Sequence, residues 1–517
     1  MATNTAHSKR IVKNSAFLYI RMLLLMGIGF YTVRVILEAL GVEDLGIYNV
    51  VGSLVAIFDF VSSGLTNSTQ RYINIGLGKN DIQLTKQYFS QSLTIHFILA
   101  LSIILLSETI GLWFVYNKLV IPSNRFNAAV IIFHFSVITL FLRLIKVCFE
   151  SDIIAREKMS IYAYLSVFEG TAKLLICYAV INNQTYDKLI FYGFLLLMIN
   201  VSITLINILY CLSKYPETHF KWYNDKKVYK QLFSFVGINS FGVISWAIGK
   251  QGLNIVLNMF CGPVVNGAKG IASNLDRVVS QFGSNIDLAV RPQITKLYAQ
   301  EEISQMVVLA MKSTKYMFFV EMLVSIPFLF QTTNILSIWL KEVPPYTAMF
   351  VRFMIIESLC NILGSGFNTM ILASGRIKSI QLYGRLITLS VLPLSYIILK
   401  ITPSPIWPML ISVILTLTYS FFLVYTANRY IYFGFNKYLN IMIKPIGKVL
   451  IITYLGCWII NNFLSIRSTP LVECIIYTFI LCCYSIIIIL YGGIEINDRK
   501  RIINIVKNKI EKCYKNR

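Results

Sequence analysis

Polar and charged residues recur at helical spacing between positions 250 and 285, inside segments that are otherwise apolar enough to cross a membrane. On the first of two helices expected there, Lys250, Asn254 and Asn258 follow one another at intervals of four and form one stripe. On the second, the spacing is three or four and the residues are Asn266, Lys269, Ser273, Asn274, Arg277, Gln281, Ser284 and Asn285. Lipid cannot solvate such a face, so it must line a water-filled cavity or a polar seam between helices. We favour the cavity.

Two cations on this face suggest the chemistry of the cavity. Arg277 lies near the middle of its expected helix, and Lys250 lies within a turn or two of the same depth. Together they could hold a phosphate or pyrophosphate through charge-assisted hydrogen bonds. Asp276 points about 100° away from Arg277 and is the candidate ion-pair partner of Lys250. The substrate-binding residues expected in a central cavity are Arg21, Lys250, Asn254, Asn274, Arg277 and Gln281.

Further ionisable residues inside apolar segments have structural explanations or a role in coupling. Lys173 follows Glu169 by four residues, the spacing of an ion pair along one helix. Arg21 and Asp59 have similar expected depths and could bridge two helices. Arg352 lies about one turn from a membrane face, where its side chain can snorkel. The candidates for ion pairing or coupling are Asp59, Asp276, Glu169, Lys173, Arg352 and Glu357.

The elements that must position these residues are membrane-spanning helices. The chain has 517 residues, of which 56% are hydrophobic and only 14% charged, a composition typical of a polytopic membrane protein. A spanning helix needs about 20 mainly apolar residues. On that rule the sequence predicts 14 helices, over residues 14–39, 45–69, 88–115, 126–148, 159–181, 188–212, 230–259, 266–290, 312–332, 346–371, 379–399, 405–428, 441–463 and 471–493.

The distribution of positive charge predicts the topology. Of the 47 Lys and Arg residues, 34 lie at the N-terminus, in every second gap between the helices and in the tail. Six lie inside the apolar segments, and the other seven occupy the alternate gaps: Lys118, Arg125, Lys188, Lys269, Lys341, Lys400 and Arg467. Cytoplasmic loops carry the excess of Lys and Arg, so both termini are expected in the cytoplasm.

Composition also bears on partners and cofactors. The net charge of +23 is confined to short loops and a basic tail, which favours anionic lipid headgroups over nucleic acid. The ten cysteines include no CxxC pair and most lie in apolar segments, so they are interpreted as small buried residues. We therefore expect no metal, no cofactor and no nucleic-acid partner.

A weak internal repeat predicts the domains. Gly41 and Gly46 follow the first helix, and Gly262 and Gly267 follow the seventh, with a cytoplasmic Arg about 30 residues past the first glycine in each case. The period of about 220 residues corresponds to six helices, so the two bundles would be related by an axis along the membrane normal. The expected domains are 1–222 (helices 1–6), 223–435 (helices 7–12), 436–493 (helices 13 and 14) and a basic cytoplasmic tail, 494–517.

The N-terminal region resembles a known family. The matching stretches are Lys13-Asn14-Ser15, the run Arg34 to Tyr48 (RVILEALGVEDLGIY), Gly64 with Arg71, and Gly78-Lys79-Asn80-Asp81. They resemble the polysaccharide-transporter branch of the MOP superfamily, which includes Wzx-type O-antigen and capsule flippases and is related to MATE antiporters and lipid II flippases. The resemblance implies an all-α MATE/MOP-like fold with 12 core helices in two six-helix lobes plus two C-terminal helices.

The resemblance also implies a function. Such proteins move an undecaprenyl-pyrophosphate-linked oligosaccharide from the inner to the outer leaflet of the bacterial inner membrane by alternating access. They serve lipopolysaccharide, capsule or exopolysaccharide synthesis, beside the polymerase and glycosyltransferases of the same pathway. Arg21, Lys250 and Arg277 match the family's habit of lining the central cavity with cations. We expect a monomer without enzymatic activity.

Two other functions remain open. A MATE-like antiporter for drugs or metabolites would use buried acids such as Asp59, Glu169 and Asp287. An integral-membrane glycosyltransferase or polysaccharide polymerase would need catalytic acids, for which Glu43 and Asp44 are candidates. Two acids in a turn more often begin a helix, and the short outer gaps leave no room for an outer catalytic domain.

Overall fold

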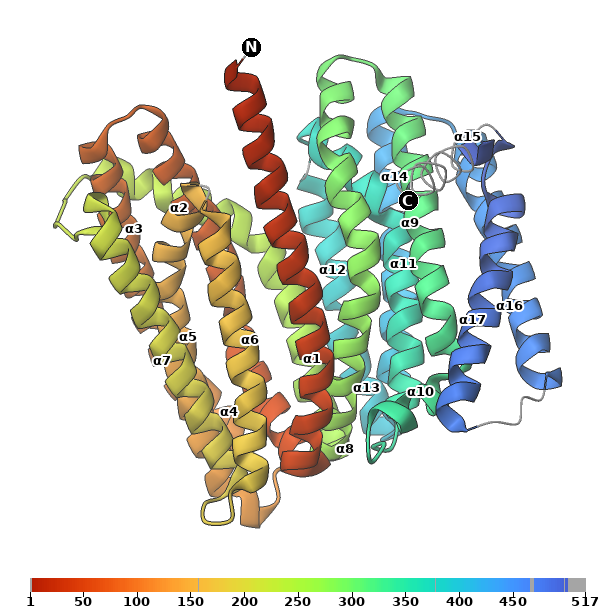
Figure 1. The fold of residues 1–517 in the computed structure, drawn as a ribbon, viewed down its shortest axis with the longest axis horizontal. Coiled ribbons are helices and arrows are strands. Elements are labelled where there is room, and N and C mark those ends of the chain that lie inside the picture. Colours follow the sequence, from red (N-terminus) through yellow and green to blue (C-terminus); the bar gives the residue numbers. More distant parts are fainter. Residues whose placement is uncertain (1, 157, 377, 465–468, 497, 501–517) are drawn as a thin grey trace, which may run out of the picture. The chain divides into compact units, whose positions relative to one another are not determined.

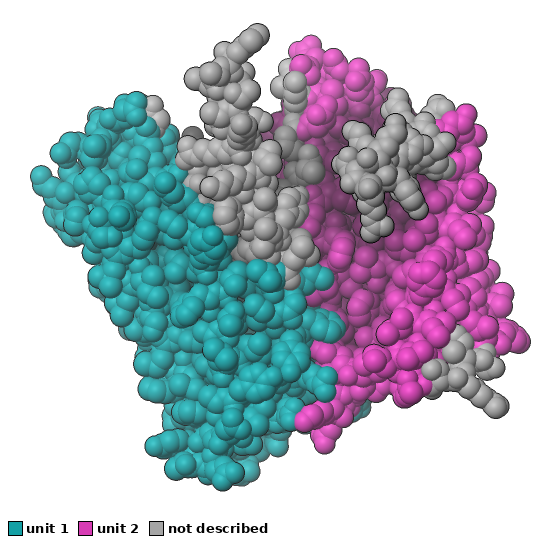
Figure 2. All heavy atoms as spheres, viewed as in Figure 1, with its two compact units in different colours: residues 1–274, 344–346, 388–411 teal, residues 275–343, 347–387, 412–517 magenta. Residues whose placement is uncertain are grey.

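The computed structural model describes residues 2–156, 158–376, 378–464, 469–496 and 498–500. Side chains are described from Leu24 onward, apart from 231–244 and scattered positions that include Asp59 and Arg71. The chain divides into two compact units, coloured teal and magenta in Figure 2. Unit 1 comprises residues 1–274, 344–346 and 388–411, and unit 2 comprises 275–343, 347–387 and 412–517.

Unit 1 is a bundle of long helices (Figure 1). Its elements are α1 (Ala2–Ala56), α2 (Asp59–Gly78), α3 (Ile82–Leu106), α4 (Leu112–Asn117), α5 (Phe126–Ala155), α6 (Met159–Asn182), α7 (Lys188–Lys214), the first part of α8 (Lys226–Ala299) and α13 (Val391–Ile401). A π-helical turn, Ser107–Gly111, joins α3 to α4. Helix α5 is central, because it packs against α2, α3 and α7, while α1 packs against α6.

Unit 2 is a second bundle, centred on α9 (Ile303–Phe330). Its other helices are the last part of α8, α10 (Thr332–Trp339), α11 (Thr347–Ser374), α12 (Arg385–Leu389, up to residue 387), most of α14 (Ile406–Ile431), α15 (Phe435–Tyr438), α16 (Lys444–Phe463) and α17 (Pro470–Ile488). Helix α9 contacts α11, α16 and α17. Among the described residues of the whole chain there is no β-strand, so the predicted all-α class is confirmed.

Two glycines interrupt the longest helices. In α1, Gly41 has φ 77° and ψ 173°, and in α8, Gly262 has φ 78° and ψ −179°. This backbone region is essentially restricted to glycine. The two glycines that begin the predicted repeat therefore adopt the same non-helical conformation, and each ends one helical segment and starts another.

Most of the helices are long and apolar enough to cross a membrane. In the described part of the chain there are 11 such candidates, or 12 if the bent pair α9–α10 is one span. The predicted count of 14 is not confirmed. Helices α1 and α8 each count once, whereas the sequence divides each of them in two at its glycine. Large apolar side chains such as Leu105, Leu209 and Phe479 are more than 60% exposed, which suits a surface facing lipid.

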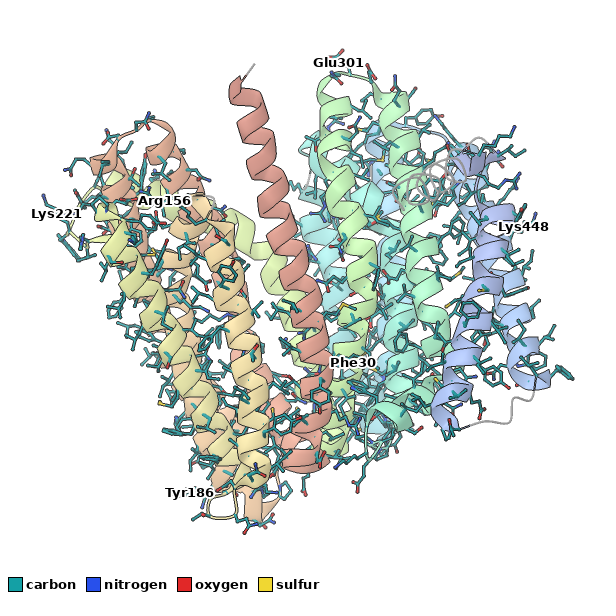
Figure 3. All side chains as sticks on the ribbon, viewed as in Figure 1. Phe30, Arg156, Tyr186, Lys221, Glu301 and Lys448 are labelled. Carbon is teal, nitrogen blue, oxygen red and sulfur yellow. The ribbon has the colours of Figure 1, made fainter. Side chains whose placement is uncertain are left out.

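Arg156 connects α5 to the segment that follows α7 in unit 1. Figure 3 shows Arg156 and Lys221 at one end of this unit and Tyr186 at the other. Arg156 forms ion pairs with Glu217 and, at 3.6 Å, with the buried carboxylate of Asp152. Its guanidinium also stacks on the ring of Tyr215 at 4.3 Å. Arg156 thus ties the end of α5 to the segment that leads out of α7.

The segment after α17 is held against α9 in unit 2. Lys312 lies 2.7 Å from Glu495 and 3.2 Å from Asp498, and the hydroxyl of Tyr316 donates to Asp498 at 2.6 Å. The start of the predicted basic tail therefore carries acids that pair with α9. Residues 501–517, the rest of the predicted basic tail, lie outside the described residues.

Candidate substrate site and its polar framework

The polar stripe of α8 begins with a fold-back of the helix at Gly262. Residues 12 and 15 positions apart in a straight helix would be separated by about 18 and 22 Å. Yet Asn266 Nδ2 donates to the main-chain oxygen of Asn254 at 2.8 Å, and Lys269 Nζ donates to Asn254 Oδ1 at 2.7 Å. The segments before and after Gly262 therefore run side by side within unit 1.

Asn254 is the centre of a polar seam in unit 1. Besides accepting from Lys269, it donates through Nδ2 to Ser53 Oγ at 2.9 Å and to Gln251 Oε1 at 3.2 Å. Asn258, one turn further on, accepts from the main-chain N–H of Val120 at 2.8 Å. Asn254, predicted as a cavity residue, thus joins α8 to the second segment of α1.

Lys269 is buried within α8. The sequence places it on the polar face of the helix expected at 266–290 and also counts it among the cations of the outward gaps, and in the structure only 6% of its surface is exposed. Burial of an ammonium group is costly unless it is paired, and the carboxamide of Asn254 supplies an acceptor. Sequence reasoning missed this contact because the acceptor lies across the Gly262 break.

A close crossing of main chains adjoins the seam. A Cβ on Gly46 would clash with the main-chain oxygen of Pro263, and one on Gly267 would lie 2.7 Å from that of Val42. Val42 and Pro263 are separated by the same number of residues as Gly46 and Gly267. Val42 and Pro263 are therefore equivalent positions in the two repeats, as are Gly46 and Gly267, and each contact is the counterpart of the other. The two predicted repeats therefore meet at a symmetric contact next to their backbone breaks.

The expected cavity residues lie on both units. Lys250 is exposed on the unit 1 part of α8, and Asn274, half-buried, donates to the main-chain oxygen of Gly270 at 2.9 Å. In unit 2, Arg277 is exposed and Gln281 is half-buried. Counted along their own helical segments, Lys250 and Arg277 are about 18 and 22 Å from Gly262. Arg21 lies outside the described side chains.

Unit 2 contains a buried acid that sequence reasoning did not place in the site. Glu321 on α9 is 1% exposed and accepts a hydrogen bond of 2.5 Å from Ser358 on α11. Its Oε2 lies over Gly283 of α8, where a Cβ would approach within 2.5 Å, and Asp276 is within electrostatic range. This position could not be inferred from spacing, because the partners of Glu321 come from other helices.

Four of the remaining ion-pair candidates have partners among the described residues. Lys173 Nζ lies 2.6 Å from Glu169 Oε1, the pair that the spacing predicted, and Lys146 lies 3.8 Å from the same carboxylate. Arg352 Nε donates to Thr332 Oγ1 at 3.0 Å. Thr416 donates to Glu357 Oε1 at 3.3 Å, and the side chain of Asp59 is outside the description.

The exposed side chains of α8 can bind anions or other polar groups. Among the described residues, no group of three or more His, Cys, Asp or Glu side chains could hold a metal ion. Exposed cations on α8 offer charge-assisted hydrogen bonds to an oxyanion. The polar seam and the glycine crossing hold in place the segment of α8 that carries Lys250.

Comparison with known proteins places the fold. No family model matches the sequence, and a search of curated proteins gives no match. Among solved structures, an inward-facing MATE-family multidrug resistance transporter of the MOP superfamily aligns with a TM-score of 0.65 and 14% identity, covering 81% of this chain and 98% of its own. The lipid II flippase MurJ, in an inward closed conformation, aligns with a TM-score of 0.68 and 12% identity, covering 90% of this chain and 97% of its own.

A third structure is a MOP-superfamily transporter from Pyrococcus furiosus. It aligns with a TM-score of 0.54 and 12% identity over 82% of this chain and 95% of its own, and a reversed polarity of its binding pocket suggests a different function for that protein. At these identities the likeness concerns the fold. The protein is a multi-pass helical membrane protein with the fold of MOP-superfamily transporters.

Proposed function

We propose that this protein is a flippase that moves undecaprenyl-pyrophosphate-linked oligosaccharide from the inner to the outer leaflet by alternating access. The observation that carries the proposal is the pair of exposed cations, Lys250 and Arg277, on a helix that is otherwise apolar enough to span a membrane. Cations at such depth are costly and typically mark a substrate pathway. The negative charges of a pyrophosphate diester match these two cations.

In this proposal the cations line a central cavity together with Arg21, Asn274 and Gln281, and they bind the pyrophosphate. Two further observations support this proposal. The MurJ structure covers 90% of this chain, against 81% for the MATE transporter, and MurJ is itself a flippase of a lipid-linked substrate. The N-terminal motifs resemble the polysaccharide branch of the superfamily.

The setting follows from the same proposal. The protein would lie in the inner membrane of a bacterium, with both termini in the cytoplasm, as the 34 cations on that side indicate. The lobes would divide near residues 222 and 435. It would act as a monomer without cofactor or enzymatic activity, supplied by glycosyltransferases and followed by a polymerase of the same polysaccharide pathway.

The MATE-like antiporter is the second candidate, and one observation favours it. Glu321 is a buried carboxylate between α9, α11 and α8, the kind of group that a cation-coupled antiporter protonates or loads. The glycosyltransferase or polymerase has less support. Asp44, one of its candidate acids, is bound at 2.5 Å by Arg125.

Reconstitution tests the proposal directly. Purified protein is placed in liposomes that contain undecaprenyl-pyrophosphate-linked oligosaccharide ending in N-acetylglucosamine. A galactosyltransferase and labelled UDP-galactose are added outside, so that only glycans on the outer leaflet are labelled. In protein-free liposomes, only the glycan in the outer leaflet is labelled. With the protein present, we expect the labelled fraction to exceed that value and to rise until the glycan of the inner leaflet has also been labelled.

The antiporter gives a different result in the same vesicles. Suppose that labelling stops at the outer-leaflet fraction while an imposed sodium or proton gradient drives uptake of a cationic dye. In that case the flippase proposal is wrong and the antiporter proposal is correct. A neutral polyprenyl monoglycoside serves as the matched lipid. Its movement at the same rate as the pyrophosphate substrate would contradict recognition of the pyrophosphate.

A further inference from the structure

A polar cavity lies in unit 2. It is found where α9 ends and α10 begins, next to the end of α16 and the start of α17. Helices α9 and α10 meet at a bend of 78°. The cavity has a volume of about 200 Å³. Its lining residues are Phe330, Gln331, Thr333, Asn334, Asn461, Glu473 and Tyr477.

The cavity is built by a chain of carboxamides. Asn334 Nδ2 donates to Gln331 Oε1 at 2.7 Å, and Gln331 Nε2 in turn donates to Asn461 Oδ1. Gln331 is only 5% exposed, so the chain is anchored inside the unit. Tyr477 is held by its hydroxyl, which donates to the main-chain oxygen of Leu464. The polar groups are therefore fixed before any ligand arrives.

The donors and acceptors of the lining that remain unpaired indicate the class of ligand. Within the described residues, the Glu473 carboxylate, both amide hydrogens of Asn461 and the Oδ1 of Asn334 have no hydrogen-bond partner. The lining thus offers acceptors and donors together, with the rings of Phe330 and Tyr477 beside them. Hydroxyl groups of a sugar need both donors and acceptors, and the apolar face of a sugar ring packs on aromatic rings.

Charge and size argue against a phosphate, a lipid tail or a drug-sized molecule. None of the lining residues is a cation, so nothing there compensates a phosphate, and the polar lining does not suit a lipid tail. A volume of about 200 Å³ is below the roughly 300–1,000 Å³ of sites for drug-sized molecules. It suits one ring of a larger glycan.

The geometry points to a saccharide-binding site at this cavity, which holds one sugar of the glycan while the pyrophosphate is bound elsewhere. This inference rests on the proposed function, because it assigns the glycan of that substrate to unit 2. It also gives α16 and α17 a role, since Asn461, Glu473 and Tyr477 come from these two helices.

Saturation-transfer NMR on the full-length protein tests the site without transport. The protein is placed in phospholipid nanodiscs free of glycoside detergents, and methyl glycosides of glucose, galactose, N-acetylglucosamine and rhamnose are the probes. We expect at least one to give a transfer signal that inorganic pyrophosphate does not displace. Glu473→Gln and Asn461→Ala should each weaken binding about tenfold, since each removes a hydrogen bond to a hydroxyl.

The control variant is Asn462→Ala, whose side chain is exposed next to Asn461 and does not line the cavity. Equal signals from wild type, Glu473→Gln and Asn461→Ala, or no signal from any glycoside, would overturn the site. Glu473→Gln keeps the shape of the side chain, so it guards against loss of folding. Flipping whose rate and preference among glycans are unchanged in Glu473→Gln would overturn the site and leave the proposed function intact. Binding of a glycoside by a protein that does not flip the lipid-linked substrate would support the site and overturn the proposed function.

Discussion

Gly46 lies against the main-chain carbonyl of Pro263, across the contact between the two backbone breaks. The counterpart contact joins Gly267 to Val42, so the same approach occurs twice. Only a residue without a Cβ permits main chains to come this close. The crossing fixes the start of the second segment of α8 against α1, and Lys250 stands on the first segment of the same fold-back.

We predict that Gly46→Ala destabilises the protein. The added Cβ meets a main-chain oxygen, which cannot rotate away, so the cost should be about 1–3 kcal/mol. The matched control is Gly52→Ala on the same helical segment, where a Cβ meets nothing within 4 Å. Thermal unfolding in detergent should show a lowered transition for Gly46→Ala and an unchanged or raised one for Gly52→Ala. Equal transitions would mean that the crossing is not tight.

Gly262→Ala tests the backbone rather than the packing. A Cβ on Gly262 would meet no atom within 4 Å, but its φ of 78° with ψ of −179° is strained for any other residue. The expected cost is about 1–3 kcal/mol. Gly447→Ala in α16, which also has open space and an ordinary helical backbone, is the control. Unfolding midpoints in denaturant compare the two, and no loss in Gly262→Ala would contradict the break at this residue.

Asn254→Ala should loosen the polar seam. The change removes the hydrogen bonds to Lys269 at 2.7 Å and Ser53 at 2.9 Å. Because Lys269 is buried, we expect a loss of about 2–3 kcal/mol. Asn274→Ala removes only a contact to the helix's own main chain, so its loss should stay below about 1 kcal/mol. Thermal unfolding of both variants decides, and a larger loss in Asn274→Ala would contradict the seam.

Much of the fold could be predicted from the sequence. The expected helices at 126–148, 159–181 and 188–212 begin where α5, α6 and α7 begin, because apolar runs there are bounded by polar loops. The repeat glycines Gly41 and Gly262 were identified by spacing alone, and both are backbone breaks. Helix ends were less predictable, since α8 continues to Ala299 with residues that favour helix outside the membrane.

Contacts between helices could not be predicted. The spacing placed Lys269 on a polar helix face, but its acceptor Asn254 becomes visible only when the chain folds back. Glu321 carries no periodic signal, because its donor Ser358 lies on another helix. The cavity at Asn461 and Glu473 arises from the ends of separate helices, and neither residue stands out in the sequence.

Asp187 provides a pH dependence outside the membrane-spanning segments. Burial raises the pKa of its carboxyl, but the hydrogen bonds from Arg125 and from the N–H of Ile190 outweigh this and lower the pKa below its usual 3.8. A carboxyl with a lowered folded-state pKa stabilises the fold above its unfolded pKa, and that stability is lost as the pH falls through the folded value. Asp187→Asn should therefore lower the thermal transition at pH 7, and the difference from wild type should shrink below pH 3.8.

The control for this prediction is Asp81→Asn. Asp81 caps α3 by accepting from Leu84 at 2.9 Å, as Asp187 caps α7, but it forms no ion pair with any described residue. Asn retains the ability to cap a helix. We expect Asp81→Asn to change the transition little at any pH. A pH-independent difference for Asp187→Asn would show that the ion pair with Arg125 contributes nothing.

The central claim is that the cations of α8 bind the pyrophosphate of a lipid-linked glycan during flipping. Its most direct test is the flipping rate of the double variant Lys250→Gln, Arg277→Gln in the labelled-galactose assay. The control is Lys221→Gln, Lys448→Gln, which removes two exposed cations of the same sign elsewhere (Figure 3). We expect the first pair to slow flipping about hundredfold, a factor of roughly ten for each charge-assisted hydrogen bond, and the control to flip like wild type. Flipping at the wild-type rate in Lys250→Gln, Arg277→Gln would contradict the claim.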